Sequence, residues 1–347
     1  MVPSAVWKEA ASIPSNYSFM SIYRFDSVTQ QIYHQLCDTI KNQQFNIQLP
    51  AFFPAEQILN LYKKAISESK QGYLYQPCSI RALSSIISQT VSLDFCSEAH
   101  SYIKTSCAVE FELDLIAREA MLRHSKYDTI KAVHSYFVRN FRYAYNHMND
   151  SRYNSGASVF LYRESVCEGF ALAYAIVLNR MGIPCGIVMG KSNLNGQLCD
   201  HAWNIVKLGT NFYHVDVTWD ICSKEKSDQN CFDYLLLDDH LAQLDHHWND
   251  RTLPPCLDPT QDFYARTGLL CTNQGDCIRT ISKQLRRKQK NISFRLTSTN
   301  MTSVVNSDVI PALLLRASRE TGIAISDFHY YSNPNIGTVH YQLHNQN

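Results

Sequence analysis

The hydrophobic pattern of this chain changes its period at Gly182, and this change constrains the fold more than any other feature. Residues 165–182, SVCEGFALAYAIVLNRMG, carry apolar side chains at spacings of three and four, which predicts a helix with one apolar face. Gly182 and Pro184 predict its end. The stretches PCGIVMG, HAWNIVKL and NFYHVDVTW follow as predicted strands, with a hairpin about Gly209–Thr210 joining the last two. A helix followed by antiparallel strands predicts an α+β fold.

Further segments continue this α+β pattern on both sides. Apolar spacing predicts helices over 27–45, 54–70, 127–142 and 277–290, and strands around 73–88, 291–296 and 338–344. Residues 106–117 are expected to be a strand that runs into a helix. The polar, Tyr-, Asn- and Ser-rich stretch 145–164 is expected to be a surface loop.

Composition and charge exclude several classes of protein. The chain has 347 residues, of which 45% are hydrophobic and 18% charged, so a sizeable core is available and global disorder is not expected. A formal net charge of +1 provides no field for nucleic acid or a membrane surface. The first 25 residues hold no signal-peptide-type apolar run, and no stretch reaches the length of a membrane span. The 12 cysteines are scattered without CxxC pairs, which favours a cytoplasmic chain with reduced thiols; export by another route stays open.

A cysteine stands at the expected start of the helix after residue 164. Ser165 and Glu168 fit a capping box, which would make Ser165 the N-cap and put Cys167 at the second helical position. Unpaired backbone N–H groups and the helix dipole favour a thiolate there. The alternative is a structural cysteine that packs as a small hydrophobic residue.

The predicted hairpin brings a histidine and a carboxylate to one face of the sheet. With Gly209–Thr210 as the turn, His201 lies opposite Thr218 and diagonally from Asp216. Diagonal neighbours are about 7–8 Å apart at the backbone, within reach of these two side chains. A carboxylate in an apolar run needs a partner, because burying an unpaired charge is costly. His201 is the partner that this register offers.

The order of these segments resembles the transglutaminase-like superfamily, papain-type cysteine enzymes with a Cys-His-Asp triad. The matching stretches are YDTIKAVHSYFVRNFRY, SVCEGFALAYAIVLNRMGIPC and HAWNIVKLGTNFYHVDVTWD, with a weaker continuation into YLLLDDHLAQLDHHW. The resemblance covers roughly residues 120–250 and points to bacterial proteins of unassigned activity. It implies that Cys167 is the nucleophile, His201 the general base and Asp216 the residue that orients it. Gly169, Trp203 and Trp219 match as packing and backbone-fit positions.

The resemblance also implies an organisation and a reaction. The expected core is a helix carrying the cysteine, packed on an antiparallel sheet carrying the histidine and the aspartate. We expect a leader over 1–25, an N-terminal α/β region over 26–119, the catalytic core over 120–250 and a C-terminal α/β extension over 251–347. The expected reaction is acyl transfer from a peptide or carboxamide through a thioester, with hydrolysis favoured over transamidation. A non-catalytic peptide-binding module on the same fold stays the alternative.

The remaining motifs are expected to be structural rather than functional. Five residues could suggest zinc, but their spacing matches no established pattern: Cys222, Cys231, His240, His246 and His247. No calcium loop is present in the sequence, so neither a metal nor a cofactor is expected. The basic run over 279–290 is expected to be a solvated helix face. Met189 and the segment 143–162 either line a substrate groove or pack. The expected partner is a peptide or protein substrate, with no nucleic acid and no membrane; the oligomeric state stays open.

Overall fold

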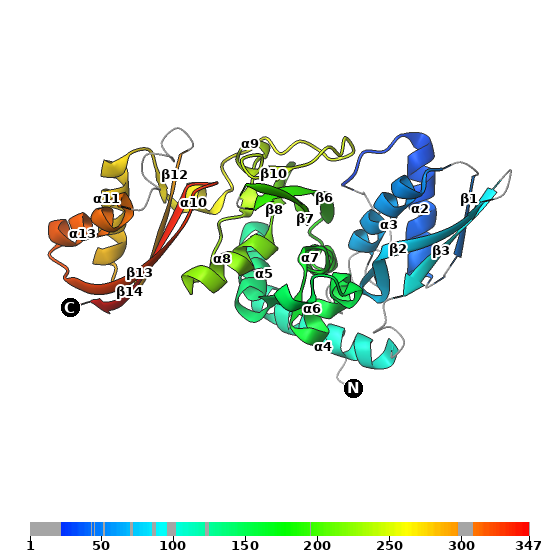
Figure 1. Cartoon of the computed structure of the whole chain (residues 1–347), viewed down its shortest axis with the longest axis horizontal. Coiled ribbons are helices and arrows are strands. Elements are labelled where there is room, and N and C mark those ends of the chain that lie inside the picture. The colour runs from blue at the N-terminus through cyan, green and yellow to red at the C-terminus, as the bar shows by residue number, and fades with distance from the viewer. Residues whose placement is uncertain are drawn as a thin grey trace.

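The computed structural model describes residues 22–42, 44, 46–50, 53–69, 72–84, 88–95, 102–121, 125–194, 196–297 and 308–346. Most of the expected leader, residues 1–21, lies outside this part of the chain. Three units follow one another along the longest axis of the molecule: an N-terminal unit, a central unit and a C-terminal unit (Figure 1). Helices and antiparallel strands occur in each, so the α+β prediction is confirmed.

The central unit is a helix packed on a five-stranded sheet. The helix is α7 (Cys167–Arg180), and it contacts β6 and β7 of the sheet. The sheet has the order β10-β6-β7-β8-β9, with strands β6 (Cys185–Leu194), β7 (Gln197–Leu208), β8 (Asn211–Val215), β9 (Leu235–Leu237) and β10 (His246–His247). Every residue of α7 from Glu168 to Leu178 is buried. A helix that is apolar all round is a buried helix, which accounts for its sequence.

The central unit has further helices besides α7. They are α4 (Tyr102–Met121), α5 (Lys126–Asn140), α6 (Gly156–Tyr162), α8 (Val217–Ser227) and the short α9 (Asp239–Ala242). A two-residue parallel pair, β4 (Arg142–Tyr143) with β5 (Glu164–Ser165), leads into α7. Two predictions in this region are wrong. Residues 106–117 lie entirely within α4, and the expected loop over 145–164 contains α6, whose first five residues are buried.

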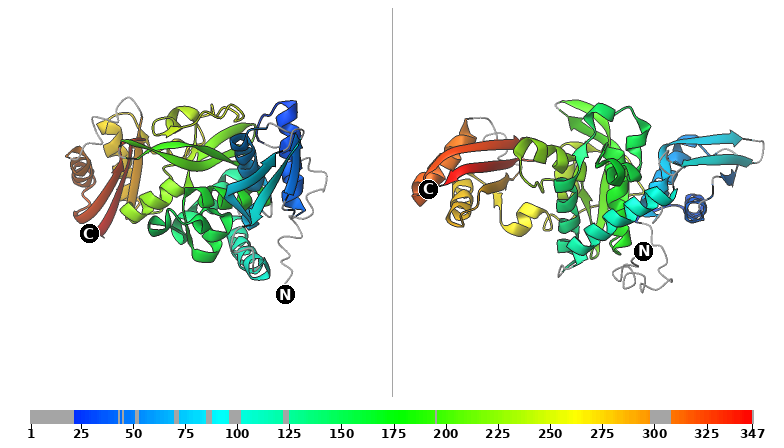
Figure 2. Two further views of the ribbon diagram at one scale, coloured as in Figure 1. Left: turned by 45° about the vertical axis from the view of Figure 1, so that its right-hand side comes forward. Right: turned by 90° about the horizontal axis from the view of Figure 1, so that it is seen from below.

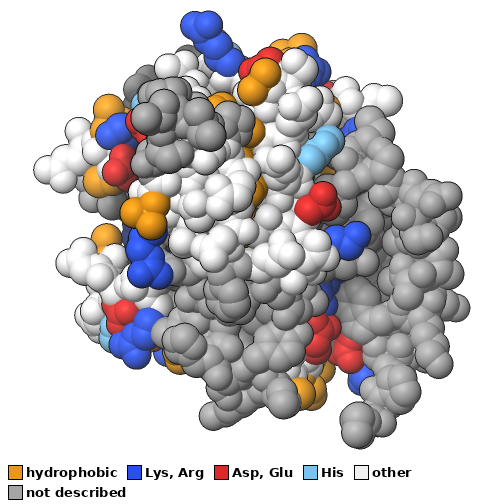
Figure 3. All heavy atoms as spheres, turned by 90° about the vertical axis from the view of Figure 1, so that its right-hand side faces the viewer, with side chains coloured by type: hydrophobic (Ala, Val, Ile, Leu, Met, Phe, Trp, Pro, Cys, Tyr) orange, Lys and Arg blue, Asp and Glu red, His pale blue; other side chains and the backbone are white. Residues whose placement is uncertain are grey.

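The N-terminal unit is a three-stranded antiparallel sheet with two helices. Its elements are α2 (Ser27–Lys41), β1 (Asn46–Pro50), α3 (Ala55–Glu68), β2 (Tyr75–Ser84) and β3 (Ser88–Phe95), with strand order β1-β3-β2. One hydrophobic core runs through this unit and the central one. Tyr23 contributes to the joint, since its hydroxyl donates to the Ile187 carbonyl at 2.9 Å. On the end face of this unit, described charged side chains of both signs are scattered without a patch of one sign (Figure 3).

The C-terminal unit has its own hydrophobic core and a four-stranded sheet. Its elements are α10 (Phe263–Thr267), β11 (Leu270–Cys271), α11 (Gln274–Arg286), β12 (Asn291–Leu296), α13 (Val309–Thr321), β13 (Ile325–Asn333) and β14 (Thr338–Gln346), with strand order β11-β12-β14-β13. The β13–β14 hairpin contacts α8 of the central unit, and Figure 2 shows the two side by side. Within the described residues, no helix combines the length and the apolar character that crossing a membrane requires.

Candidate active site

Cys167 is the first residue of α7, and the capping box predicted around it is wrong. The N-cap is Val166, and no side chain caps the helix. Ser165 instead belongs to β5, and its buried hydroxyl contacts the Tyr153 carbonyl at 2.5 Å and the Ser158 hydroxyl at 2.7 Å. The β4–β5 pairing therefore holds Ser165 in an extended strand, one residue before the N-cap position, so that it does not cap α7. Cys167 still lies among the unpaired N–H groups of a helix start.

Gly169 lets the start of α7 lie close against the preceding chain. A Cβ atom at this position would come within 2.1 Å of the Ser165 hydroxyl oxygen. It would also lie 2.8 Å from the carbonyl oxygens of Tyr153 and Ser155. Two of these three neighbours are backbone atoms, so they cannot move aside cheaply. Glycine is therefore required here, because the helix start approaches these atoms too closely for a side chain. This close approach sets how near Cys167 lies to the preceding loop.

The hairpin has the register expected from the sequence up to Val215. Asn204 pairs with Val215 and Leu208 with Asn211, around a turn whose Gly209 has φ of +65°. The predicted strand through Thr218 is wrong, because α8 begins at Val217. Asp216 is the N-cap of that helix, and its Oδ1 accepts a hydrogen bond from the Trp219 amide at 3.1 Å.

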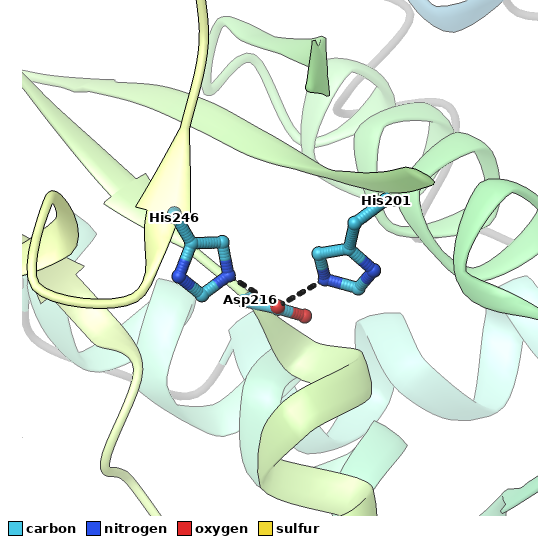
Figure 4. A group of neighbouring side chains, drawn as sticks. All are labelled: His201, Asp216 and His246. Carbon is cyan, nitrogen blue, oxygen red and sulfur yellow. Dashed lines mark hydrogen bonds and ion pairs between the residues drawn. The ribbon is translucent and has the colours of Figure 1, made fainter. Parts of the chain in front are cut away.

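The structure brings His201 and Asp216 together. The Nε2 atom of His201 lies 2.6 Å from Oδ2 of Asp216, and both side chains are buried (Figure 4). Burial has the largest effect on His201 and lowers its pKa. The charge and hydrogen bond of Asp216, with smaller contributions from Cys167, outweigh burial and raise the pKa of His201 to about 10. Burial likewise favours a protonated Asp216, but His201 and His246 hold the pKa of that carboxyl well below its usual range.

Cys167, at the start of α7, lies near His201. It contributes less than Asp216 does to the raised pKa of His201. The three segments that the sequence singled out thus lie close together, with Asp216 paired to His201 and Cys167 nearby. Such an arrangement can move a proton from sulfur to nitrogen while the carboxylate stabilises the imidazolium.

His246 is a member of the site that sequence reasoning missed. Its Nε2 lies 3.0 Å from the same Oδ2 atom of Asp216 (Figure 4). Its Nδ1 lies 2.6 Å from Oδ1 of Asp245. The sequence suggested it only as a metal ligand. The available signal was that DHHW places an aspartate and histidines in one apolar stretch, where each buried polar group needs a partner.

Aromatic rings enclose the His201, Asp216 and His246 side chains. Trp203 is stacked on His201 with ring centroids 5.9 Å apart, and Trp219 packs against His246 at 4.9 Å. The space left beside Asp216 and His246 is about 10 Å³. A cavity of that size holds at most one water molecule.

Two groups of described side chains are close enough to be considered as metal ligands: His201, Asp216 and His246, and His214, Asp239 and Cys256. In the first group, the spacings of 2.6 and 3.0 Å are those of hydrogen bonds. Ligand bonds of about 2.0–2.2 Å around a tetrahedral zinc would separate these atoms further. The first group therefore fits an ion-pair network better than a metal.

The second group is excluded by the tautomer of His214. Nε1 of Trp203 donates to Nδ1 of His214 at 3.0 Å, so Nδ1 is an acceptor and carries no proton. Nε2 must then carry the proton, and it donates to Asp239 at 2.9 Å. A metal at Nε2 would need that position unprotonated. Cys222 and Cys231 lie in neither group; they contact Tyr145 and Ser227 respectively.

The segment between β4 and α6 forms one border of the site. Burial, with a further contribution from nearby Cys167, raises the pKa of Tyr143. The Tyr145 hydroxyl donates to Sγ of Cys222 at 3.4 Å. Residues 145–151 line an open hollow of about 690 Å³. Met189, the other residue suggested for a groove, is half-buried and packs against the main hydrophobic core.

Comparison with known proteins finds a family match for one part of the chain. Residues 116–217 match the family model described as "Transglutaminase-like superfamily". This segment is similar to transglutaminase-like domains. The match includes Cys167, His201 and Asp216. Transglutaminase-like proteins are usually cysteine enzymes.

Solved structures with similar folds cover only parts of the chain. A crystal structure of a TGase is 17% identical, with a TM-score of 0.30, and the alignment covers 50% of this chain and 50% of that one. A structure from Cytophaga hutchinsonii, described as "a Putative Cysteine Protease", is 16% identical, with a TM-score of 0.28, over 40% of this chain and 61% of that chain. This chain thus spans about half the length of the first solved relative. No curated protein matches it.

Proposed function

We propose that this protein is a cysteine-dependent acyl-transfer enzyme acting on peptide or carboxamide bonds. The observation that carries the proposal is the buried His201–Asp216 pair at 2.6 Å, with Cys167 at a helix start near His201. Cys167 is the nucleophile, His201 the general base and acid, and Asp216 the group that orients and stabilises the imidazole. The N–H groups at the start of α7, including that of Cys167, supply donors for the oxyanion.

The reaction has two stages. His201 takes the proton from Cys167, and the thiolate attacks the carbonyl carbon of the substrate. When the tetrahedral intermediate collapses, the C–N bond breaks, and His201 returns the proton to the departing amine. The acyl group is then bound to sulfur as a thioester. Water attacks that thioester with His201 as base, and its cleavage yields a carboxylic acid and the free thiol.

The acceptor in the second stage decides between hydrolysis and transamidation. A primary amine in place of water would form a new amide. We favour hydrolysis, with water as the default acceptor. The hollow lined by residues 145–151 is the proposed place where a peptide or protein substrate lies.

The test is labelling with a thiol alkylator, read by site-resolved mass spectrometry, alongside turnover of a peptide library with and without added amine. We expect Cys167 to react fastest near neutral pH, and Cys167→Ala to abolish both labelling at that site and turnover. Cys107, an exposed cysteine on α4, provides the matched control, since Cys107→Ala should leave turnover unchanged.

Each result of this experiment has a definite meaning. New amide products with added amine would reassign the enzyme as a transamidase. A Cys167 that reacts only after unfolding would remove the catalytic role and leave the peptide-binding module as the better interpretation.

A further inference from the structure

We infer that His246 is a positioning residue. It is a buried imidazolium that holds the Asp216 carboxylate in place, and it interacts with the negative charge of Asp216 together with His201. The inference rests on the proposed function only for its effect on catalysis. The charge state of His246 follows from its own contacts.

Both ring nitrogens of His246 face carboxylates. Nε2 is 3.0 Å from Asp216 and Nδ1 is 2.6 Å from Asp245. An ionised carboxylate only accepts hydrogen bonds, so a ring between two of them carries a proton on both nitrogens. The His246 side chain is 2% exposed. Burial lowers its pKa, but the hydrogen bonds and charges of the two carboxylates outweigh burial and raise it.

The other groups around His246 are mostly neutral. The ring lies near two more imidazoles, of His201 and His214, and near the phenol of Tyr234. His214 is neutral, because its Nδ1 accepts from Trp203 while burial lowers its pKa. Burial raises the pKa of Tyr234 well above its usual value, so this phenol is also neutral. The charges that face His246 are therefore those of Asp216, Asp245 and a protonated His201.

His246 changes both the geometry and the basicity of the proposed triad. Oδ2 of Asp216 accepts from two imidazoles, and Oδ1 accepts from the Trp219 amide, so the carboxylate cannot rotate without breaking a buried bond. The His246 ring centroid lies 5.5 Å from that of His201. A positive charge at that distance opposes protonation of His201. His246 thus keeps the pKa of His201 lower than Asp216 alone would set it.

The network continues into the C-terminal unit. Oδ2 of Asp245 accepts from the Tyr234 hydroxyl at 2.7 Å, and that hydroxyl accepts from Nδ2 of Asn333 at 2.7 Å. Asn333 is the last residue of β13. The position of His246 is therefore fixed from both sides, by Asp216 at the site and by Asp245 with its partners behind it.

The first test reads the charge of His246 directly. Two-bond ¹H–¹⁵N spectra of the imidazoles are recorded at pH 8 on full-length Cys167→Ala protein, and His246→Gln assigns the signal. We expect both nitrogens of His246 to be protonated. A neutral His246 ring at that pH would overturn the inference. This readout needs no activity, so it decides the role of His246 even if Cys167 proves unreactive and the proposed function fails.

The second test reads the effect on His201. The upper limb of the pH–rate profile for Cys167 alkylation reports the pKa of His201, and we expect His246→Gln to move it up by about one pH unit. His246→Phe, which has no donors, should also lower turnover roughly ten- to hundredfold by releasing Asp216. His214→Gln is the matched control, since His214 is another buried histidine bonded to an aspartate. If His246 had a purely structural role, the upper limb of the alkylation profile would stay at the same pH in folded variants of His246 and of His214. That result would overturn the inference.

Discussion

At the residue scale, the positions around Cys167 and His201 are defined by close contacts and by charge. Gly169 illustrates the contacts, since its missing side chain is what allows α7 to begin against the backbone of Tyr153 and Ser155. His201 and Asp216 illustrate the charge, since each raises the population of the other's ionised form. Each of these properties leads to a measurement on a single substitution.

Gly169→Ala should destabilise the fold and slow labelling of Cys167. The added Cβ would lie 2.1 Å from one oxygen and 2.8 Å from two others, so the helix start has to shift. Overpacking of this kind costs about 1–3 kcal/mol. Gly156→Ala is the control, because its Cβ would meet only ordinary contacts at 3.4 Å or more. Equal unfolding free energies for the two variants in urea would contradict this account.

The His201–Asp216 pair should make stability depend on pH in a specific window. The pKa of His201 is raised from 6.5 to about 10 in the folded protein. Its contribution is therefore complete below pH 6.5 and is lost as the pH rises toward 10. The pKa of Asp216 is lowered from 3.8, so its contribution is present above that pH and lost in acid.

We therefore expect the Tm difference between the wild-type protein and Asp216→Asn to be largest between about pH 4 and 6.5. It should shrink steadily as thermal melts are recorded at higher pH up to 10. A difference that grew with pH over that range would show that the pair is not the source of the stabilisation.

At the scale of elements, the hairpin was predictable from the sequence and its end was not. Alternating apolar residues on both sides of Gly209–Thr210 define one register, and the observed pairs follow it. Val217, Thr218 and Trp219 also favour strands by propensity. They form a helix instead, and Asp216 caps it through the Trp219 amide.

Two other elements show why local patterns were insufficient. The apolar run of α6 was hidden in a Tyr-, Asn- and Ser-rich stretch, so composition favoured a loop. Ser165 fits a capping box in sequence. In the structure it pairs with β4 instead of capping α7, and that pairing is a contact between segments distant in sequence. The roles of Cys167, His201 and Asp216 were expected from the same segments, and they remain a proposal. The role of His246 depends on a tertiary neighbour that no local pattern contains.

Gly209→Val should cost about 1–2 kcal/mol of stability, because Gly209 has φ of +65° and a β-branched residue tolerates that region poorly. No atom lies within 4 Å of a Cβ at this position, so the cost comes from the backbone alone. Gly209→Asn should cost less, since asparagine visits this region more readily. Chemical denaturation checks the order of the two variants, and an inverted order would refute the argument.

At the scale of the whole molecule, buried charged groups join the central unit to the C-terminal unit. Arg295 of β12 donates to the Asp233 carbonyl of the central unit, and within its own unit it pairs with Asp262, the N-cap of α10, at 2.5 Å. The Asp233 carboxylate in turn accepts from Thr338 of β14 at 2.7 Å and lies 2.9 Å from Nε2 of His340. These contacts are specific in geometry and costly to break one at a time, so they fix how the two units meet.

Arg295→Met should destabilise the protein by about 3–5 kcal/mol, because it leaves the Asp262 carboxylate buried without its partner. Arg316→Met is the control, since the Arg316–Glu320 pair is exposed and such pairs contribute about 0–1 kcal/mol. Limited proteolysis should cut the Arg295 variant first between the two units. Similar stability in the two variants would mean that the buried contacts of Arg295 do not hold the units together.

Asp216 combines two duties in one side chain, since one oxygen caps α8 and the other faces the imidazoles. A mutagenesis campaign that replaces it with alanine would confound them, because a drop in turnover could reflect an unravelled helix start. Asparagine caps helices about as well as aspartate does, yet it carries no charge. The asparagine substitution therefore separates the effect of the Asp216 charge on turnover from its effect on the start of α8. The alanine substitution would change both at once.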